Sequence, residues 1–167
     1  MTEQPTPTPS DQPQRGKREH RAKLVFLAVI LIVAGAIYWT QTRPPRLNAW
    51  QDDLPGALAQ AREQNRPVVV FFMEAKAAPG SPTQRMISGC LKMVGVTKPL
   101  ERYKYVPVAV AMDHSLNSDL ARQYQLDTLP TLLFLTSTGT ERERRSGFVG
   151  AAEVQAMIIR NAPITVQ

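Results

Sequence analysis

The sequence is poor in the residues that usually carry redox and metal chemistry. It has one cysteine, Cys90, and two histidines, His20 and His114. A single cysteine excludes an internal disulfide, and no second histidine or cysteine stands at the spacing of a zinc site. We therefore expect no bound metal, and nothing in the sequence indicates a cofactor.

The positive charge also lacks the pattern of a nucleic-acid-binding protein. The formal net charge is +6, but no stripe of basic residues alternates with aromatic ones, so we expect no nucleic-acid partner. The charge is unevenly divided along the chain. Residues 1–23 carry five Lys/Arg against three Asp/Glu, residues 24–40 carry none, and residues 41–167 carry fifteen against eleven.

The first 40 residues differ sharply from the rest. Residues 1–23 are rich in Pro, Gln, Thr and charge, which predicts a disordered basic tail. Residues 24–40 are apolar and uncharged, with a length near the lower limit of about 17 residues for a transmembrane helix. A cleaved signal peptide is the alternative, because residues 34–36 fit the small-x-small cleavage pattern. Residues 37–39 continue the apolar run past that point, which favours an uncleaved anchor and leaves both interpretations open.

The flanking charges predict how such an anchor is oriented. Residues 15–23 hold five Lys/Arg, whereas the other flank has only Arg43 and Arg46 before Asp52. The positive-inside tendency then places the N-terminal tail in the cytoplasm. Residues 41–49 become a linker, and residues 50–167 a domain on the extracytoplasmic side, the periplasmic side of the inner membrane in a bacterium with two membranes.

Residues 50–167 alternate helix and strand patterns, as an α/β domain does. Apolar, β-branched runs predict buried strands, and Gly139 marks a turn before a charged strand that suits a sheet edge. Apolar periodicity and capping residues predict the helices. The order predicts a mixed sheet with helices on both faces. The strands are expected at 68–73, 106–112, 131–135 and 141–149. The helices are expected after a cap at Asp52 or Asp53 to about Gln64, from Ser81 with an apolar stripe that reaches Leu91, from Ser115 or Asn117 through Tyr124, and at 151–161.

The ordered set of local motifs resembles the thioredoxin-like fold over about residues 50–160. Residues 65–72 resemble the start of the strand that leads to the family's active site, and residues 103–113 resemble its central strand. Residues 120–126, followed by 129–135, resemble the family's Leu-Ala…Tyr and Pro-Thr-hydrophobic signature. The similarity is greatest to the extracytoplasmic branch, which has a helix before the first buried strand.

The resemblance implies a peptide-binding site at Leu129, Pro130 and Thr131. In the family, the proline follows a cis peptide bond, and the backbone of the residue before it pairs with an extended substrate. The sequence by itself also permits a trans proline at the start of a strand. An extended peptide or a partner protein is therefore the expected ligand.

The resemblance also places the family's Cys-x-x-Cys motif at Ala78-Pro79-Gly80-Ser81, within one residue, and both cysteines are absent there. The motif needs a thiolate that the helix N-terminus stabilises and a second thiol that resolves the mixed disulfide. Dithiol exchange within this chain is excluded. Ser81 is explained as a helix N-cap, because no histidine or acid at a recognisable spacing would activate it as a nucleophile.

Cys90 is the remaining candidate for thiol chemistry. It follows Ser81 by about nine residues, or ~13 Å along a helix, where the effect of the helix dipole has faded. The favoured interpretation is a buried, inert thiol on an apolar stripe. A thiol that pairs with a partner protein is the alternative.

Three functions remain for such a chain. The first, which the sequence favours, is a membrane-anchored, non-catalytic module that binds a protein or an extended peptide. The second is a structural subunit of a membrane complex. The third is a monothiol oxidoreductase that uses Cys90.

Overall fold

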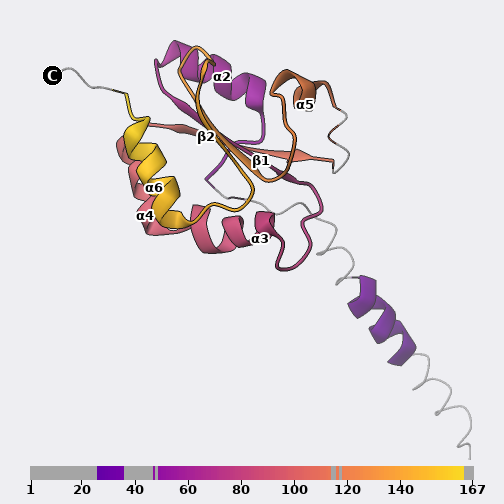
Figure 1. Ribbon diagram of the computed structural model, residues 1–167. Coiled ribbons are helices and arrows are strands. Elements are labelled where there is room, and N and C mark those ends of the chain that lie inside the picture. Colours follow the sequence, from indigo (N-terminus) through magenta and orange to yellow (C-terminus); the bar gives the residue numbers. More distant parts are fainter. Residues whose placement is uncertain (1–25, 36–46, 48, 114–115, 117, 164–167) are drawn as a thin grey trace, which may run out of the picture. The chain divides into compact units, whose positions relative to one another are not determined.

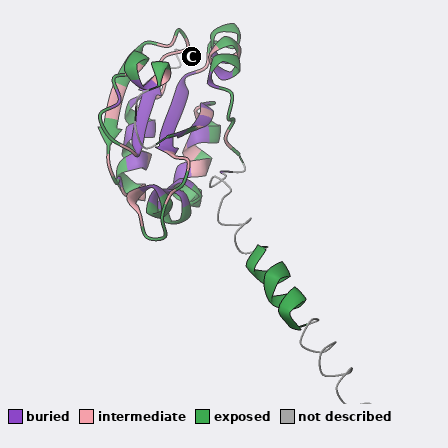
Figure 2. Cartoon of the chain, turned by 90° about the vertical axis from the view of Figure 1, so that its right-hand side faces the viewer, coloured by how far each residue is buried: buried purple, intermediate pink, exposed green. Residues whose placement is uncertain are grey.

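The chain divides into two compact units, Met1–Thr42 and Arg43–Gln167. The computed structural model describes residues 26–35, 47, 49–113, 116 and 118–163. In the first unit, residues 26–35 form a helix that is exposed along its length (Figure 2). The predicted tail, part of the linker and both ends of the predicted membrane segment lie outside the described residues. Within the described part, no helix is long and apolar enough to cross a membrane.

The second unit contains a four-stranded sheet with helices on both faces (Figure 1). In chain order its elements are α2 (Leu54–Glu63), β1 (Val68–Glu74), α3 (Pro82–Met86), the π-helical turn η1 (Ile87–Leu91), α4 (Val94–Arg102), β2 (Val106–Met112), α5 (Asp119–Gln123), β3 (Thr131–Leu135), β4 (Glu141–Ser146) and α6 (Ala151–Arg160).

The sheet has the strand order β2-β1-β3-β4. β1 and β2 are parallel, with Val68 opposite Val106, and the connection between them runs through α3, η1 and α4. β3 is antiparallel to β1, and β4 is antiparallel to β3. The predicted mixed sheet, with a parallel half and a terminal antiparallel hairpin, is confirmed.

The central strands are buried on both faces. Successive strand residues point to opposite sides of a sheet. Phe71 therefore lies in the layer with residues of α3, η1, α4 and α6, and its neighbour Phe72 lies in the layer with α2 and α5. Both side chains are 0% exposed. Because both layers are apolar, β1 and β3 are continuous apolar runs, as the sequence predicted for strands covered on both sides.

The two edge strands are protected in different ways. β4 is an edge strand made of charged residues, as predicted, and such charge discourages pairing with a second chain. The outer edge of β2 is partly occupied by Gln51. Its N–H donates to the Pro107 carbonyl at 3.0 Å, and its carbonyl accepts from the Ala109 N–H at 2.8 Å.

Side-chain caps fix where the helices begin. Asp53, Ser81 and Ser118 each accept a hydrogen bond from the backbone N–H three residues further on. Ser81 was predicted as a cap, and Asp53 was one of the two candidates for the first cap, with Asp52. The third corrects the sequence analysis, because α5 begins after Ser118 and not after Ser115 or Asn117, which lie outside the described residues.

The segment between β1 and β2 differs most from the prediction. The α-helix that begins after Ser81 ends at Met86 and continues as the π-helical turn η1, and the sequence analysis missed α4 altogether. Gly95 and Pro99 lie inside α4 and have low helix propensity. The sequence pattern therefore did not indicate a helix at these residues. Tertiary packing stabilises the helix instead, because Val96 and Leu100 are buried in the core.

Glu143 ties the edge strand β4 to the end of α6. Its Oε1 accepts from Arg160 Nη2 at 2.5 Å, and its Oε2 accepts from Asn161 Nδ2 at 2.6 Å. Arg145 lies 3.3 Å from the same carboxylate. The hydrogen bond from Arg160 is the main reason why the pKa of Glu143 lies below its usual value.

Glu143→Gln should lower the free energy of unfolding by about 1–2 kcal/mol at neutral pH, between the range for charge-assisted bonds and that for exposed ion pairs. Because the pKa is lowered in the folded state, the carboxylate stabilises the fold fully above its unfolded pKa of about 4.3. That stabilisation disappears as the pH falls through the folded pKa. Urea unfolding between about pH 7 and pH 2 measures it.

Glu153→Gln is the matched control. Its carboxylate pairs with Arg145 at 3.2 Å and its side chain is 53% exposed, so we expect a loss below about 0.5 kcal/mol. If Glu143→Gln lowers the free energy of unfolding by the same amount at acidic pH as at neutral pH, the carboxylate charge is not what stabilises the contact between β4 and the end of α6.

Candidate functional site

The candidate site lies where β1 ends and α3 begins. Residues 75–81 connect the two elements, and the loop starts with a hydrogen bond from the Ala75 N–H to the Met112 carbonyl at 2.9 Å. The Ser81 N–H donates to the Ala78 carbonyl at 3.0 Å, which closes a tight turn. Gly80 has a φ of 77°, a left-handed conformation that favours glycine. The predicted window Ala78-Pro79-Gly80-Ser81 thus forms this turn.

The N-terminus of α3 is capped by its own side chains. Ser81 Oγ accepts from the Gln84 N–H at 3.2 Å, and Gln84 Oε1 accepts from the Gly80 N–H at 2.5 Å. This reciprocal arrangement is close to a capping box, whose Ser-x-x-Gln signature is present in the sequence. Donors that could stabilise a thiolate at this position are therefore engaged within the loop, and Ser81 serves as a structural cap.

Thr83, in the first turn of α3, was missed by the sequence analysis. It is 0% exposed, and its Oγ1 has no hydrogen-bond partner among the described residues. Thr83 precedes Met86, Ile87 and Cys90 by three, four and seven residues, so it begins the apolar stripe that the sequence did show. That spacing was the signal that could have placed it on the inward face.

The turn before β3 lies at the same end of the sheet. Thr131 pairs with Phe72 near the carboxyl end of β1, so the chain before it reaches the end from which the loop departs. The Leu129–Pro130 peptide bond is cis, as the resemblance implied. The Pro130 carbonyl accepts from the Gly147 N–H at 2.7 Å. Thr131 Oγ1 donates to the Thr128 carbonyl at 2.7 Å, which closes the turn.

A third segment, which follows β4, completes this surface. Phe148 is 49% exposed, and the guanidinium of Arg85 from α3 lies 4.7 Å from the centre of its ring. Gly147, its neighbour, is bonded to Pro130. The contacts thus link α3, the Pro130 turn and the segment after β4. The sequence analysis named neither Arg85 nor Phe148, although a lone aromatic between Gly147 and Gly150 was a visible signal.

A cavity of about 350 Å³ lies beside the loop, between it and the end of β2. Its polar lining comes from Glu74, Lys76, Ser81 and Asp113. None of the described residues that line it is a cysteine or a histidine, and Ser81 Oγ is already engaged as the cap of α3. In the described part of the chain, no three His, Cys, Asp or Glu side chains gather as metal ligands would.

Cys90 is placed in the core and away from the loop. It lies in η1, is 1% exposed, and packs in the layer that includes Phe71 and Met86. Burial raises the pKa of its thiol to about 11. Because the thiolate is the reactive form, a thiol with that pKa is almost entirely protonated and unreactive near neutral pH.

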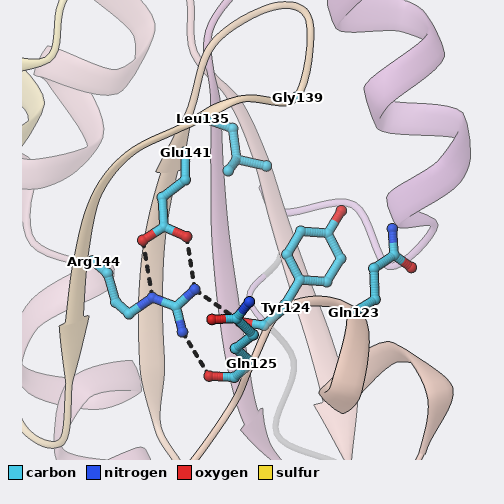
Figure 3. Close-up of a pocket in the computed structure, with 7 residues that line it drawn as sticks. All are labelled: Gln123, Tyr124, Gln125, Leu135, Gly139, Glu141 and Arg144. Carbon is cyan, nitrogen blue, oxygen red and sulfur yellow. Dashed lines mark hydrogen bonds and ion pairs between the residues drawn. The ribbon is translucent and has the colours of Figure 1, made fainter.

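A second cavity, of about 290 Å³, lies between β4 and the end of α5 (Figure 3). Arg144 lines this cavity, but its guanidinium is hydrogen-bonded to other groups of the protein. Its guanidinium forms a fork with both oxygens of Glu141, at 2.9 and 2.7 Å. It also donates to the carbonyls of Gln125 and Tyr124, at 2.8 Å each. Arg144 therefore clamps the edge strand to α5 and has little capacity left for a ligand.

Solved structures with the same fold include several redox proteins. A thioredoxin from Thermus thermophilus is 26% identical, with a TM-score of 0.54, over 68% of this chain and 87% of that one. The C-terminal domain of Neisseria meningitidis DsbD in its oxidised form is 19% identical, with a TM-score of 0.50, over 68% and 99%. A DsbH oxidoreductase is 18% identical, with a TM-score of 0.52, over 73% and 92%.

Comparison with curated protein sequences gives no match. A family model described as a thioredoxin-like domain does match, and it covers residues 54–161, which is more than half of the chain. This range contains every strand of the sheet, the loop at residues 75–81 and the Pro130 turn. The chain belongs to the thioredoxin-like domain family.

Proposed function

We propose that this chain is a membrane-anchored, non-catalytic thioredoxin-like module that binds a protein or an extended peptide. One observation carries the proposal: contacts link the loop and α3, the Pro130 turn and the segment after β4 into one surface, and no cysteine lies among its described residues. Binding needs that surface, whereas dithiol exchange needs two cysteines that the sequence lacks.

The surface has features that suit an extended segment. Leu129 is half-buried beside the buried Pro130, so part of this residue is open to a ligand. Backbone pairing supplies affinity without chemistry, and neighbouring side chains supply selectivity. Phe148 adds an exposed aromatic ring, held by Arg85, next to the turn. Aromatic and arginine side chains are enriched where proteins bind one another.

A monothiol oxidoreductase fits the structure less well. It would require Cys90 to be accessible and to have a lowered pKa, but Cys90 is buried and its pKa is raised to about 11. The name of the similar DsbH protein records oxidoreductase activity for that protein. Its activity does not transfer to a chain without the cysteine pair, so fold similarity leaves binding as the better-supported function.

The anchor is the second part of the proposal. Residues 24–40 are uncharged, and the helix at residues 26–35 exposes large apolar side chains, a surface that lipid would cover. The basic flank at residues 15–23 favours a cytoplasmic N-terminus and a domain on the periplasmic side. A tether of a few residues would then concentrate the module near membrane-bound partners. The exposed apolar residues are Phe26, Leu27, Val29, Ile30, Leu31, Ile32 and Val33.

Alkylation of Cys90 tests the non-catalytic assignment. With a pKa of about 11, roughly one thiol in a thousand is ionised at pH 8, so native Cys90 should react with iodoacetamide at least about 100-fold more slowly than an exposed thiol. Denaturation in urea should remove the difference. Ala78→Cys, which adds an exposed thiol in the loop, is the positive control and should label quickly without urea. Rapid native labelling of Cys90 would favour the monothiol alternative.

Binding itself is tested with an unfolded polypeptide whose thiols have been blocked with iodoacetamide. A photo-crosslinking p-benzoylphenylalanine in place of Phe148 should capture this polypeptide, because binding does not depend on disulfide chemistry. The same probe in place of Arg62, on α2 and in the opposite layer, is the control and should capture at least about fivefold less. The measurement is the yield of crosslinked product by gel.

Two results would refute binding at this surface. One is an equal yield from both probe positions. The other is capture that appears only when the polypeptide carries free thiols or disulfides, since that would indicate exchange chemistry. Acceleration of insulin disulfide reduction by dithiothreitol with the purified chain would refute the non-catalytic assignment directly.

A further inference from the structure

The outer face of α4 and α6 carries a second surface, remote in sequence from the Pro130 turn. A shallow cavity of about 810 Å³ lies there, lined by Val94, Lys98 and Arg102 of α4 and by Ile159 of α6, among others. None of its lining residues belongs to the loop, the Pro130 turn or the Phe148 segment. The two surfaces can therefore be occupied at the same time.

Exposed apolar side chains gather on this face. Val94 and Ile159, which line the cavity, are 62% and 49% exposed, and Met93, next to Val94 in the chain, is 49% exposed. Among the described residues from 47 onward, Phe148 is the one other large apolar side chain with such exposure. Apolar residues scattered singly on a surface are ordinary, but a group of them around one cavity indicates a surface that something covers.

Positive charge exceeds negative charge in and around α4, and Lys98 and Arg102 line this cavity together with Glu101. Exposed cationic side chains stand before, within and after α4, and Glu101 is the one acid between residues 92 and 104. On α6, Glu153 is paired with Arg145, so its carboxylate does not offset this charge, and Arg160 is paired with Glu143 and does not add to it. None of the four cationic groups forms an ion pair with another described residue. These groups are Lys92, Lys98, Arg102 and Lys104.

The chain enters the domain from this side of the sheet. Leu47 is buried in the core layer that also contains Val96 and Leu100 of α4 and Ile158 of α6. The linker at residues 41–49 spans at most about 30 Å when fully extended. If the preceding segment is anchored as proposed above, this linker keeps the domain within that distance of the membrane, and the inference rests on that anchor.

We propose that the face formed by α4 and α6 docks on the anionic phospholipid surface of the membrane that anchors the chain. The apolar side chains enter the boundary between headgroups and acyl chains, and the lysines and Arg102 contact lipid phosphates. Apolar groups flanked by flexible cations are the usual composition of such interfacial surfaces. The short tether favours lipid over an acidic protein as the occupant, because it keeps the domain close to a lipid surface at all times.

The test uses the full chain with vesicles and an environment-sensitive probe. Val94→Cys is labelled with a nitrobenzoxadiazole dye and mixed with vesicles of 30% phosphatidylglycerol and 70% phosphatidylcholine. The emission should shift to the blue and be quenched by doxyl-labelled lipid. In vesicles of phosphatidylcholine alone, or at high salt, the shift should largely disappear. The control is Glu63→Cys, which carries the dye on α2 in the opposite layer and should show neither effect.

Charge variants test the lipid phosphates directly. Lys98→Gln with Arg102→Gln should reduce the docking equilibrium constant by roughly 25-fold, since each basic residue near an anionic surface contributes about a factor of five. Arg62→Gln with Arg122→Gln removes the same charge elsewhere and should leave docking unchanged. Equal losses from the two pairs, or no dye response at position 94, would overturn the proposal.

A separate measurement distinguishes the docking from the anchor. Extraction of the vesicles with sodium carbonate at high pH should leave the full chain in the membrane if residues 24–40 are inserted. Release of the chain would refute the anchor, while the dye response at position 94 would still decide whether the α4–α6 face docks. A dye response to an acidic polypeptide as strong as that to anionic vesicles would assign the surface to a protein partner and overturn the lipid assignment.

Discussion

The antiparallel pairing of β1 with β3 determines both the core and the site. It sets Phe72 opposite Thr131, and this register brings the Pro130 turn to the end of β1 where the loop begins. A shift of one residue would turn every side chain of β3 to the opposite layer. Because both layers are closely packed with apolar residues, such a shift is strongly disfavoured, and the geometry of the surface follows from the burial of the sheet.

The loop shows how this scaffold accommodates the loss of the cysteine pair. A helix N-terminus offers unpaired N–H groups, which a thiolate would use in a redox member of the family. Here Ser81 and Gln84 satisfy such donors within the loop. The N-terminus of α3 is thereby stabilised without an anion. The surface around it remains available for non-covalent contacts that need no disulfide exchange.

Most of the fold could be predicted because its signals are local. Continuous apolar runs identified the three buried strands, charge identified the edge strand, and caps identified two helix starts. α4 was missed because its stability comes from packing against α6 and η1, while Gly95 and Pro99 argue locally against a helix. The contact of Arg85 with Phe148 could not be predicted either, since it joins positions far apart in sequence through the sheet register.

The residues of the site differ in whether the stability of the fold alone explains their positions. Pro130, Thr131 and Thr83 are buried, so the fold alone would require most of their contacts, and their geometry would persist in a protein that binds nothing. Phe148 is different, because half of its surface is exposed and an aromatic ring gains little stability in water. Its placement over α3, next to the Pro130 turn, is therefore the feature that stability explains least and that binding explains best.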